Sequence, residues 1–553
     1  MKISSSFLLT LLWGYTLFSI SFLAEAQHAD HRCVTYERDL AKRADFHMKS
    51  MSFFDRWVTV NKIAVRSSFR TQSESITSSN PLRLQVIFHI IHNGEVEGIG
   101  TNIRDDQVYS QLEAMNEDFH LRTAEAENIP DVFKDVATTI PIEFVPAAFD
   151  PNGNPLDELG INRVLSDQSS WSFNSLDQVL IPQIIWDTEK YLNVFVARFN
   201  NSDLGYAFYP TGTSIDDIDN VNHVFGSQFR DGLVMSYLAL GSNFTSYGDR
   251  FDLYEDFEYG HTASHEVGHY LGLHHIWGYS DNSNCEPEND DFCEDTPSQS
   301  SSNLDIGSPC AFPGPDRCDD DDLPDMFMNF MDYSLDVCMS MFTLDQKERM
   351  FTVLENSPRR KTLGKGVPLA DISLEVRVDE RNERTILWSN NGETDEDTGY
   401  LVVRKRFNTE EVRYLTFMDR AEGVFVDSDF LERAEEYYYQ VFAVNTSGYS
   451  KPSISIDATG SPITSSDDFY TPSLELIIGP NPSTGTVSLS GSVICIGKEF
   501  HFALYNTKGQ LVLEKSVLPN SETVSLNLEH LPKGIYLLKT LSENSQVKRI
   551  VLQ

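Results

Sequence analysis

The sequence has few basic residues for its length. Its 553 residues include 43 Lys and Arg against 83 Asp and Glu, which gives a formal net charge of −40. Nucleic-acid-binding proteins need a basic surface to contact phosphates, so no nucleic-acid partner is predicted. The excess of carboxylates is explained first by a solvated acidic surface, and some of them could also hold calcium in an exported protein.

Long apolar runs are scarce as well. The only one, Phe7–Leu23, follows Lys2 and is followed by the small-residue stretch Ala24-Glu25-Ala26. This order is typical of a signal peptide over residues 1–26, although a membrane anchor is the competing interpretation. No later segment is apolar over 18 residues, so no transmembrane segment is predicted in the mature protein. Export would permit disulfide bonds.

Cysteine is rare and unevenly placed. Of seven cysteines, Cys33 lies near the N-terminus, Cys495 near the C-terminus, and five lie in one loop-rich stretch: Cys285, Cys293, Cys310, Cys318 and Cys338. Five is an odd number, so at most two disulfides form among them and one thiol remains. The stretch lacks CxxC spacing, which disfavours a cysteine-only zinc site and favours disulfides that hold the loops together.

The chemistry of the sequence centres on residues 265–275, His-Glu-Val-Gly-His-Tyr-Leu-Gly-Leu-His-His. On an α-helix, His265 and His269 return to the same face one turn apart and can bind one ion. Gly272 allows the helix to end in a left-handed residue, so that the chain turns back and presents His275. Three neutral imidazoles on zinc leave a fourth position for water, and Glu266 is placed to take its proton.

Two further residues fit this zinc site by their order in the chain. Met331 lies 56 residues after His275, and Tyr333 follows it closely. The HExxHxxGxxH pattern is the metzincin signature, which a methionine-containing turn completes. Met331 would form an apolar floor beneath the imidazoles, and Tyr333 would donate to the oxyanion of the tetrahedral intermediate. Otherwise both residues simply pack in the core. His274 is expected near the metal or at the surface, not as a ligand.

The segment before residue 82 is polar and predicts a propeptide over residues 27–81. Its single cysteine, Cys33, is either a fourth metal ligand that blocks the catalytic water, or an ordinary free thiol or disulfide half. Arg66 and Arg70 lie in what reads as a loop, where activating cleavage is expected.

The length of the chain predicts three or four domains. Before the zinc motif, Leu82–His92, Ile140–Phe144 and Tyr191–Ala197 have strand-like patterns, and Asp105–Phe119 has a helical one. These elements predict a mixed sheet with helices, as in the upper half of an α/β protease.

At this point the sequence resembles the pappalysin family of metzincins, particularly its ulilysin-like members. The resemblance spans about residues 82–361 and is densest in the segments His265–Trp277, Glu294–Pro297, Asn329–Tyr333, Asp336–Thr343, Gln346 and Arg349–Met350. It implies a zinc metalloendopeptidase with zinc on His265, His269 and His275, Glu266 as general base and acid, Met331 in the methionine turn and Tyr333 in the transition state.

The resemblance also implies calcium near Asp295 and Thr296. Family spacing suggests the disulfides Cys310–Cys338 and Cys318–Cys285, with Cys293 as the odd thiol unless it replaces Cys285. Relatives that cut before arginine or lysine carry an acidic residue where this chain has Val337. A pocket lined by valine favours apolar side chains, because an unpaired guanidinium is costly to desolvate. Basic specificity is therefore not carried over.

From Ile372 onward the periodicity is strand-like, as in Ile372–Val378, Thr385–Trp388, Tyr400–Val403 and Tyr437–Asn445. Residues 367–462 resemble a fibronectin type III module, in which Trp388 is the core tryptophan and Tyr437 or a neighbour is the corner tyrosine. A spacer role is preferred to a substrate-binding one.

Residues 463–473 form a Ser/Thr/Pro-rich linker. Residues 474–553 contain Gly479-Pro-Asn-Pro-Ser-Thr-Gly485, a Lys-Gly turn in Leu531–Leu537 and a basic, apolar end. They resemble the C-terminal sorting domain of type IX secretion cargo in Bacteroidetes. The resemblance implies that the type IX machinery is a partner, and that the protein is secreted or displayed on the surface of a Gram-negative bacterium.

Together these patterns predict a multidomain protein: an α/β metzincin-type zinc protease domain followed by two all-β sandwich domains. The predicted function is a secreted zinc endopeptidase, made as a zymogen, that cuts extracellular proteins or peptides. The alternative is a zinc-containing surface adhesin with a residual protease domain. The intact Glu266 argues against it, because such a protein has no need of the base.

Overall fold

The computed structural model describes residues 33–39, 51–69, 81–210, 230–248, 250–279, 285, 290–304, 306, 310–318, 323–365, 370–392, 398–419, 421–431, 433–461, 477–479, 483, 485–490, 500–506, 511–518, 523–528, 530–540 and 547–552. The predicted signal peptide, Arg70, Cys495 and the linker lie outside these residues. Within the described ranges, no helix is long and apolar enough to cross a membrane.

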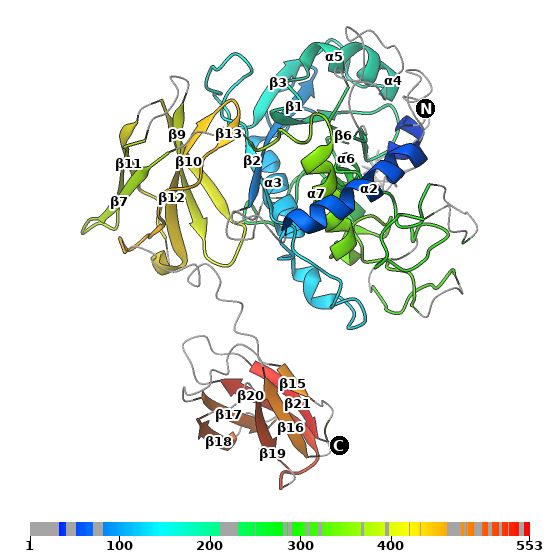
Figure 1. Ribbon diagram of the computed structural model, residues 1–553. Helices are drawn as coiled ribbons and strands as arrows, with labels where there is room; N and C mark the ends of the chain where they lie inside the picture. Colours follow the sequence, from blue (N-terminus) through cyan, green and yellow to red (C-terminus); the bar gives the residue numbers. More distant parts are fainter. Residues whose placement is uncertain are drawn as a thin grey trace, which may run out of the picture.

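The first region is a mixed sheet covered by helices (Figure 1). Its elements are α2 (Met51–Phe69), β1 (Leu82–His92), α3 (Asp105–Phe119), η1 (Ala124–Asn128), β2 (Ile142–Pro146), β3 (Ile161–Leu165), α4 (Phe173–Ser175), η2 (Leu176–Leu180), α5 (Ile181–Ile184), β4 (Tyr191–Ala197), β5 (Gly205–Ala207), β6 (Leu233–Ser236), η5 (Glu255–Phe257), α6 (His261–Tyr270), η7 (Asp336–Cys338) and α7 (Leu344–Asn356).

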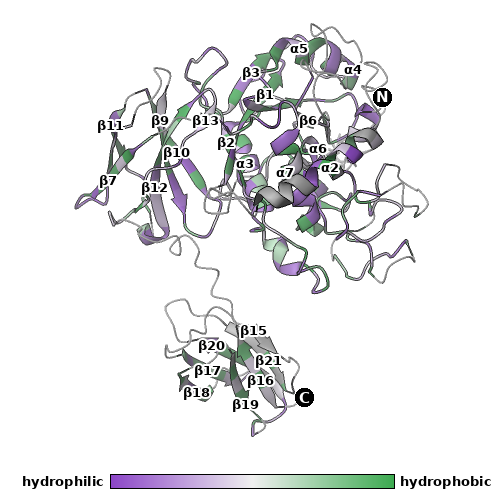
Figure 2. Cartoon of the chain, in the orientation of Figure 1, coloured by the Kyte–Doolittle hydropathy of each residue, from purple (hydrophilic) through white to green (hydrophobic). Residues whose placement is uncertain are grey.

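The strand order of this sheet is β2-β1-β4-β6-β5, with β3 also paired to β1. All pairs are parallel except β5 with β6, so the short strand β5 forms an antiparallel edge. One face of the sheet packs on the core that contains α3, α6 and α7, and the other face packs on a smaller core around Trp171 and Tyr206. Figure 2 shows hydrophobic residues along β1, in keeping with burial on both faces.

Helix α2 corrects one prediction. Arg66 was expected in a loop, but it lies within this 19-residue helix. Within the helix, Phe54, Trp57 and Val58, at i, i+3 and i+4 spacing, are buried against Val353 of α7 and Tyr209. The helix was missed because the whole segment before residue 82 was interpreted as polar, although more than half of the residues in Met51–Phe69 are apolar.

A second region follows, made of two facing sheets. Its strands are β7 (Ile372–Val378), β8 (Arg384–Asn390), β9 (Gly399–Arg406), β10 (Val412–Met418), β11 (Glu422–Asp427), β12 (Tyr437–Asn445), β13 (Gly448–Tyr449) and β14 (Ile456–Asp457), with η8 (Ala434–Glu436). Sheets β11-β8-β7 and β10-β9-β12-β13 enclose a core in which Trp388 is buried. Among Tyr437 and its neighbours at the start of β12, Tyr439 is the fully buried tyrosine, and its hydroxyl donates to Asp427 at 2.6 Å.

The C-terminal strands form a separate pair of sheets (Figure 1). They are β15 (Ile477–Gly479), β16 (Thr486–Ser490), β17 (Phe500–Asn506), β18 (Leu511–Val517), β19 (Thr523–Asn527), β20 (Gly534–Thr540) and β21 (Val547–Leu552). Their orders are β15-β16-β19 and β18-β17-β20-β21, and the two sheets share one apolar core. The β-rich nature predicted for the last third of the chain is therefore confirmed.

Candidate metal centre

Helix α6 carries the first two histidines of the predicted site. Asp118 of α3 anchors the helix, accepting hydrogen bonds from the His261 ring at 3.0 Å and from the Ser264 hydroxyl. After Tyr270 the helix ends in a Schellman motif: the Gly272 amide donates to His269 O and the Leu273 amide donates to Gly268 O, each at 2.9 Å. Gly272 has φ +92°, a left-handed conformation that glycine adopts without strain. The chain can therefore reverse and bring His275 back towards the helix.

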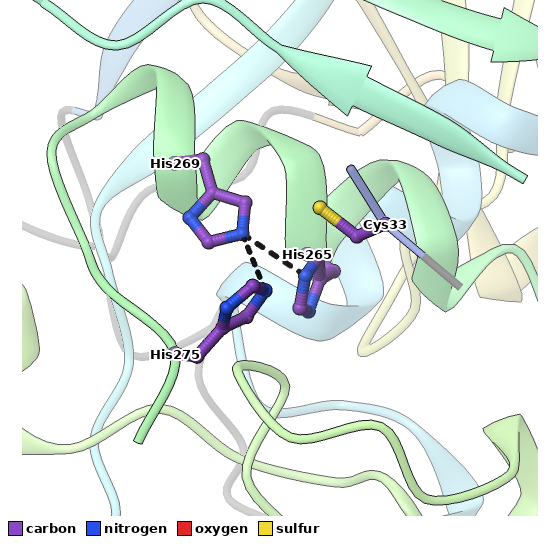
Figure 3. A group of neighbouring side chains, drawn as sticks. All are labelled: Cys33, His265, His269 and His275. Atoms are coloured by element: carbon purple, nitrogen blue, oxygen red, sulfur yellow. Dashed lines mark hydrogen bonds between the residues drawn. The ribbon is translucent and has the colours of Figure 1, made fainter. Parts of the chain in front are cut away.

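The three imidazoles converge as the sequence predicts. His269 Nε2 lies 3.1 Å from His265 Nε2 and 3.1 Å from His275 Nε2, and all three rings are buried (Figure 3). The opposite nitrogens are already used: Nδ1 of His265 donates to Phe330 O at 2.7 Å, and Nδ1 of His269 donates to Leu273 O at 2.8 Å. These bonds fix the tautomers of His265 and His269, so the Nε2 lone pairs of these two rings face each other.

Lone pairs that face each other at this distance repel unless a cation lies between them. Two nitrogens bound to one zinc ion at about 2.0–2.1 Å in tetrahedral geometry are about 3.3 Å apart, close to the separation here. Burial lowers the pKa of His269 to about 3, so its ring is neutral and free to act as a ligand at neutral pH. The residues present therefore fit a metal ion.

Cys33 completes the group. Its Sγ and the three histidine nitrogens all lie within 4.8 Å of one another, which makes a three-nitrogen, one-sulfur donor set (Figure 3). The residue is held there by strand β5, because Cys33 forms a parallel bridge with Gly205 and the Val34 amide donates to Gly205 O at 3.3 Å. Burial, and then the Glu266 charge, raise the pKa of the Cys33 thiol. A cation among these donors would offset both effects and favour the thiolate.

Glu266 lies beside the histidines and is fully buried. Its Oε2 accepts a hydrogen bond from the Thr35 hydroxyl at 2.8 Å, and the same hydroxyl accepts one from the Ala207 amide at 2.7 Å. The N-terminal segment therefore contacts the predicted base as well as the predicted metal position. The sequence offered no signal for Thr35, because the pairing with Glu266 spans 231 residues.

Tyr333 and Met331 lie on the other side of the group. The Tyr333 hydroxyl donates to Cys33 O at 2.8 Å, and its ring lies 4.8 Å from the His275 ring, centroid to centroid. Met331 is buried beneath α6, and a Cβ added at Gly268 would lie 2.4 Å from its Sδ. Gly268, a variable position in the signature, is thus the residue that lets the methionine approach the helix.

His274 is not part of the histidine group, as expected. Its Nε2 pairs with Asp55 of α2 at 2.8 Å, and Asp55 also accepts from Arg349 and from the Tyr279 hydroxyl. Burial opposes the charge on Asp55, but His274 and Arg349 outweigh it and lower the carboxyl pKa. The Tyr209 hydroxyl lies 3.4 Å from His274 Nδ1 and 3.0 Å from His269 Nδ1, so it connects this cluster to the metal ligands.

The predicted calcium ligands have other partners. Asp295 accepts from the Thr343 hydroxyl at 2.6 Å and from the Asp345 amide at 2.9 Å, at the N-terminus of α7. The Thr296 hydroxyl donates to Asp291 at 2.9 Å. Among the described residues, only the Cys33 group meets the geometry for three or more metal-binding side chains. The calcium prediction has no support here.

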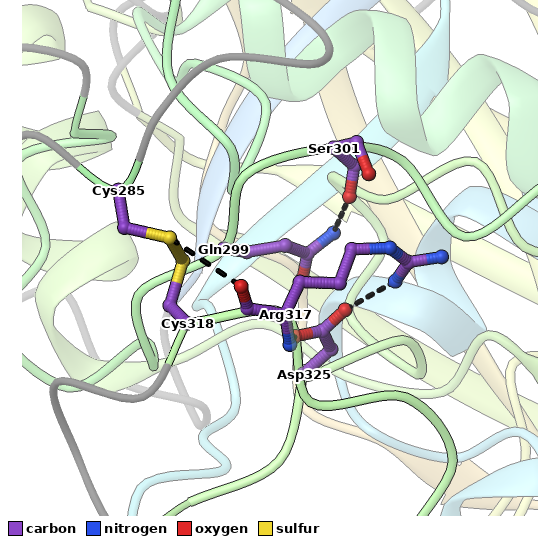
Figure 4. The surroundings of a disulfide bond; sticks show 6 residues. All are labelled: Cys285, Gln299, Ser301, Arg317, Cys318 and Asp325. Atoms are coloured by element: carbon purple, nitrogen blue, oxygen red, sulfur yellow. Dashed lines mark hydrogen bonds and ion pairs between the residues drawn. A yellow bond between two sulfur atoms is a disulfide. The ribbon is translucent and has the colours of Figure 1, made fainter.

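The disulfide pairings implied by the family resemblance are confirmed. Cys285 bonds to Cys318 and Cys310 bonds to Cys338, while Cys293 is buried as a free thiol. Figure 4 shows the first bridge beside Arg317, which forms an ion pair with Asp325. The Cys285–Cys318 bridge precedes Met331 and Tyr333 in the chain, and the Cys310–Cys338 bridge spans them, so both limit the movement of the loops on that side.

Asp336, at the start of η7, accepts hydrogen bonds at the N-terminus of helix α6. Its Oδ2 accepts from the Tyr259 and His261 amides at 3.3 Å each, at the N-terminus of α6. A carboxylate there stabilises the helix that carries His265 and His269.

Comparison with known proteins agrees with this geometry. Residues 243–355 match the family described as pregnancy-associated plasma protein-A, and residues 478–553 match the secretion system C-terminal sorting domain. An extracellular metalloprotease of Sordaria macrospora is 30% identical over 204 residues, which are 37% of this chain and 61% of that protein. The chain spans 54% and 60% of the corresponding proteins of Neurospora crassa and Podospora anserina.

Two solved structures from Tannerella forsythia are also similar. Mature mirolysin in complex with a cleaved peptide is 32% identical, over 51% of this chain and 94% of the solved one, with a TM-score of 0.42. A promirolysin variant is 29% identical over 60% and 96%, with a TM-score of 0.46. By its histidine group and these sequence matches, the chain belongs to the pappalysin family of metalloproteases and ends in a secretion-system sorting domain.

Proposed function

We propose that this chain is the precursor of a secreted zinc-dependent endopeptidase that cuts extracellular proteins or peptides. The observation that carries the proposal is the convergence of His265, His269 and His275 around one point, with the buried Glu266 beside it. The three histidines would hold the ion. When bound, zinc supplies a Lewis acid that polarises the substrate carbonyl and lowers the pKa of water.

The chain's own residues supply the remaining chemistry. Glu266 is the general base that takes the proton of the attacking water and returns it to the leaving amine. Tyr333, whose hydroxyl now donates to Cys33 O, would donate to the substrate oxygen once that segment is gone. Met331 packs beneath α6 and supports the histidines.

We infer that residues 27–81 keep the precursor inactive. Three contacts support this role: Cys33 Sγ among the histidines, the Thr35 hydroxyl on Glu266, and Asp55 on Arg349 and His274. With Cys33 as fourth ligand the site is closed to water, as in structural zinc sites. Removal of the segment would open the ion, the base and Tyr333 together.

The C-terminal part is assigned to delivery. Residues 367–462 would be a fibronectin type III-like spacer, 463–473 a linker, and 474–553 a type IX sorting domain recognised by the secretion machinery. The sorting-domain match and the extracellular relatives support secretion or surface display in a Bacteroidetes-type bacterium.

The function is tested with the full-length protein after limited proteolysis removes the N-terminal segment. The wild type is expected to hydrolyse casein, to lose this activity with a zinc chelator and to recover it with zinc. Glu266→Gln should retain one zinc per chain by metal analysis and lose at least about a thousandfold in turnover, because it cannot accept the proton. Glu255→Gln, an exposed carboxylate on the approach to α6, is the matched control.

Two results would contradict the proposal. One is a correctly folded wild-type protein that contains no zinc. The other is casein hydrolysis by Glu266→Gln at the wild-type rate.

A further inference from the structure

Arg38 of the N-terminal segment contacts a group of polar and aromatic side chains near the metal centre. One guanidinium nitrogen donates to Asn174 Oδ1 at 2.9 Å and the other forms an ion pair with Asp177. The guanidinium carbon lies 5.7 Å from the centroid of the Tyr206 ring. Beside Arg38 is a cavity of about 270 Å³, lined in the described structure by Trp171, Ser172, Phe173, Asn174, Asn200 and Asn201.

Asp177 is buried and belongs to the catalytic region, not to the segment. Its side chain is 3% exposed, and its other oxygen accepts a hydrogen bond from the Tyr206 hydroxyl. Burial, and then the Asp177 charge, raise the pKa of the Tyr206 phenol, so the phenol remains a donor to the carboxylate. Arg230 also lies near enough to lower this pKa, so the region carries a further positive charge.

The pocket lies behind the edge strand that borders the metal centre. In β5, Gly205 and Ala207 contact the segment, and a Cβ at Gly205 would lie 3.7 Å from Glu266 Cγ. Tyr206 points to the opposite face, because side chains alternate along a strand, and packs in the core around Trp171. Once the segment is removed, an extended peptide added to this edge would pass both the metal centre and the Asp177 pocket.

Removal of the segment leaves the pocket without Arg38. The buried carboxylate then loses the side chain that makes the direct ion pair with it, which is costly unless a cation from another chain replaces it. In the precursor, Arg38 is the cation that pairs with this carboxylate.

We propose that, in the enzyme freed of residues 27–81, Asp177, Asn174 and Tyr206 form a subsite for one arginine side chain of the substrate. The inference rests on the proposed endopeptidase function and deepens it by naming a substrate feature. The subsite is separate from the Val337 pocket considered above, since Val337 packs on the core of the opposite face of the sheet.

Arginine fits this subsite better than lysine. The planar guanidinium can reach two acceptors at once and stack on the Tyr206 ring, whereas the lysine ammonium offers one nitrogen. Citrulline has nearly the same shape as arginine but no charge, so it isolates the ion pair with Asp177.

The test pairs enzyme variants with substrate variants. Peptides with a single arginine, moved from four residues before to four residues after the scissile bond, are each compared with a citrulline twin. The full-length protein, activated by limited proteolysis, is expected to prefer arginine at one position by at least about tenfold in kcat/KM. In Asp177→Asn this ratio should fall towards one, as a double-mutant cycle of enzyme and substrate requires.

Two further variants separate the subsite from general damage. Asn174→Ala removes an exposed acceptor at the rim and should lower the arginine preference partly without disturbing the buried Asp177. Asp167→Asn makes the same chemical change as Asp177→Asn on an exposed carboxylate ten residues earlier in the chain and should leave the ratio unchanged. Cleavage of the citrulline peptides reports the endopeptidase function separately from the subsite.

The proposal is overturned if no position shows a preference for arginine over citrulline. It is also overturned if Asp177→Asn lowers cleavage of both twins equally, so that the ratio stays at its wild-type value.

Discussion

A single residue, Cys33, contacts both the histidine group and Tyr333. Its sulfur brings the donor set to three imidazole nitrogens and one sulfur, and its carbonyl accepts a hydrogen bond from the Tyr333 hydroxyl. The thiol of this residue thus lies among the predicted metal ligands, and its carbonyl engages Tyr333, the group expected to stabilise the transition state. The sequence left open whether Cys33 is a metal ligand, an ordinary free thiol or half of a disulfide. Only the fold brings it to His265, which lies 232 residues later in the chain.

Replacement of Cys33 tests this role. Cys33→Ala in the full-length precursor should shorten the lag before casein hydrolysis begins by about tenfold or more, because the segment loses its bond to the metal. Cys293→Ala, which removes the other free buried thiol among the described residues, is the control and should leave the lag unchanged. An unaltered lag in Cys33→Ala would exclude the thiol from latency.

Among the elements, helix α2 shows where prediction from sequence reaches its limit. Strands β1, β4, β7 and β12 and helix α3 were predicted with their observed bounds, because burial gives each a clear local pattern. The three predicted zinc ligands are also local, since they fall within eleven residues. Helix α2 depends instead on distant partners, and its Asp55 meets Arg349 294 residues later.

The same limit explains the weak calcium prediction. A motif of aspartate and threonine is compatible with a cation, but here Asp295 bonds to the start of α7, where Thr343 and Gln346 form a capping box. Whether such a carboxylate binds a cation or accepts hydrogen bonds depends on the groups that the fold brings near it. Local sequence cannot supply that information.

Asp55 is predicted to hold α2 in place. In Asp55→Asn the buried Arg349 loses its charged partner, so release of the segment should become about a hundredfold more favourable. Limited proteolysis should then remove α2 faster from the Asp55→Asn precursor than from the wild type. Mass spectrometry of the time course measures the two rates. Arg56→Gln, on the exposed face of the same helix, serves as the control. Equal cleavage rates for Asp55→Asn and wild type would show that the ion pair does not anchor the helix.

In the whole molecule, the catalytic region and the β7–β14 region are joined by a buried interface. Val145 and Phe149 pack against Leu401 and Phe442 in one apolar cluster. Nearby, Glu143 pairs with Arg83 of its own region at 2.8 Å and with Lys405 of the other. A region fixed in this way is more than a loose spacer, and we expect it to contribute to the stability of the protease.

This ion pair predicts a dependence of stability on pH. Burial alone would raise the pKa of Glu143, but Lys405 and Arg83 hold it at about 2. Because the folded pKa lies below the unfolded value of about 4.3, the contribution of about 3 kcal/mol is complete above that pH and is lost as the pH falls towards 2. Thermal unfolding between pH 7 and pH 2 should show this loss.

Glu143→Gln should unfold at a lower temperature than wild type at pH 7 and change less between pH 4.3 and pH 2. Glu375→Gln breaks an exposed pair with Arg377 and should follow the wild-type curve, since surface pairs contribute little. Parallel curves for Glu143→Gln and wild type would mean that the interface does not depend on this charge.

The donor set around Cys33 also bears on how the protein would acquire its ion. Four ligands in a dry, closed site capture zinc more strongly than three ligands and solvent do. We therefore expect zinc to bind before activation. The precursor would bind the ion with Cys33 as a fourth ligand, and removal of the segment would then lower the zinc affinity and open the ion to substrate. Equilibrium dialysis of precursor and mature forms against a zinc buffer would reveal the order, because the precursor should retain the ion at free concentrations that leave the mature form empty.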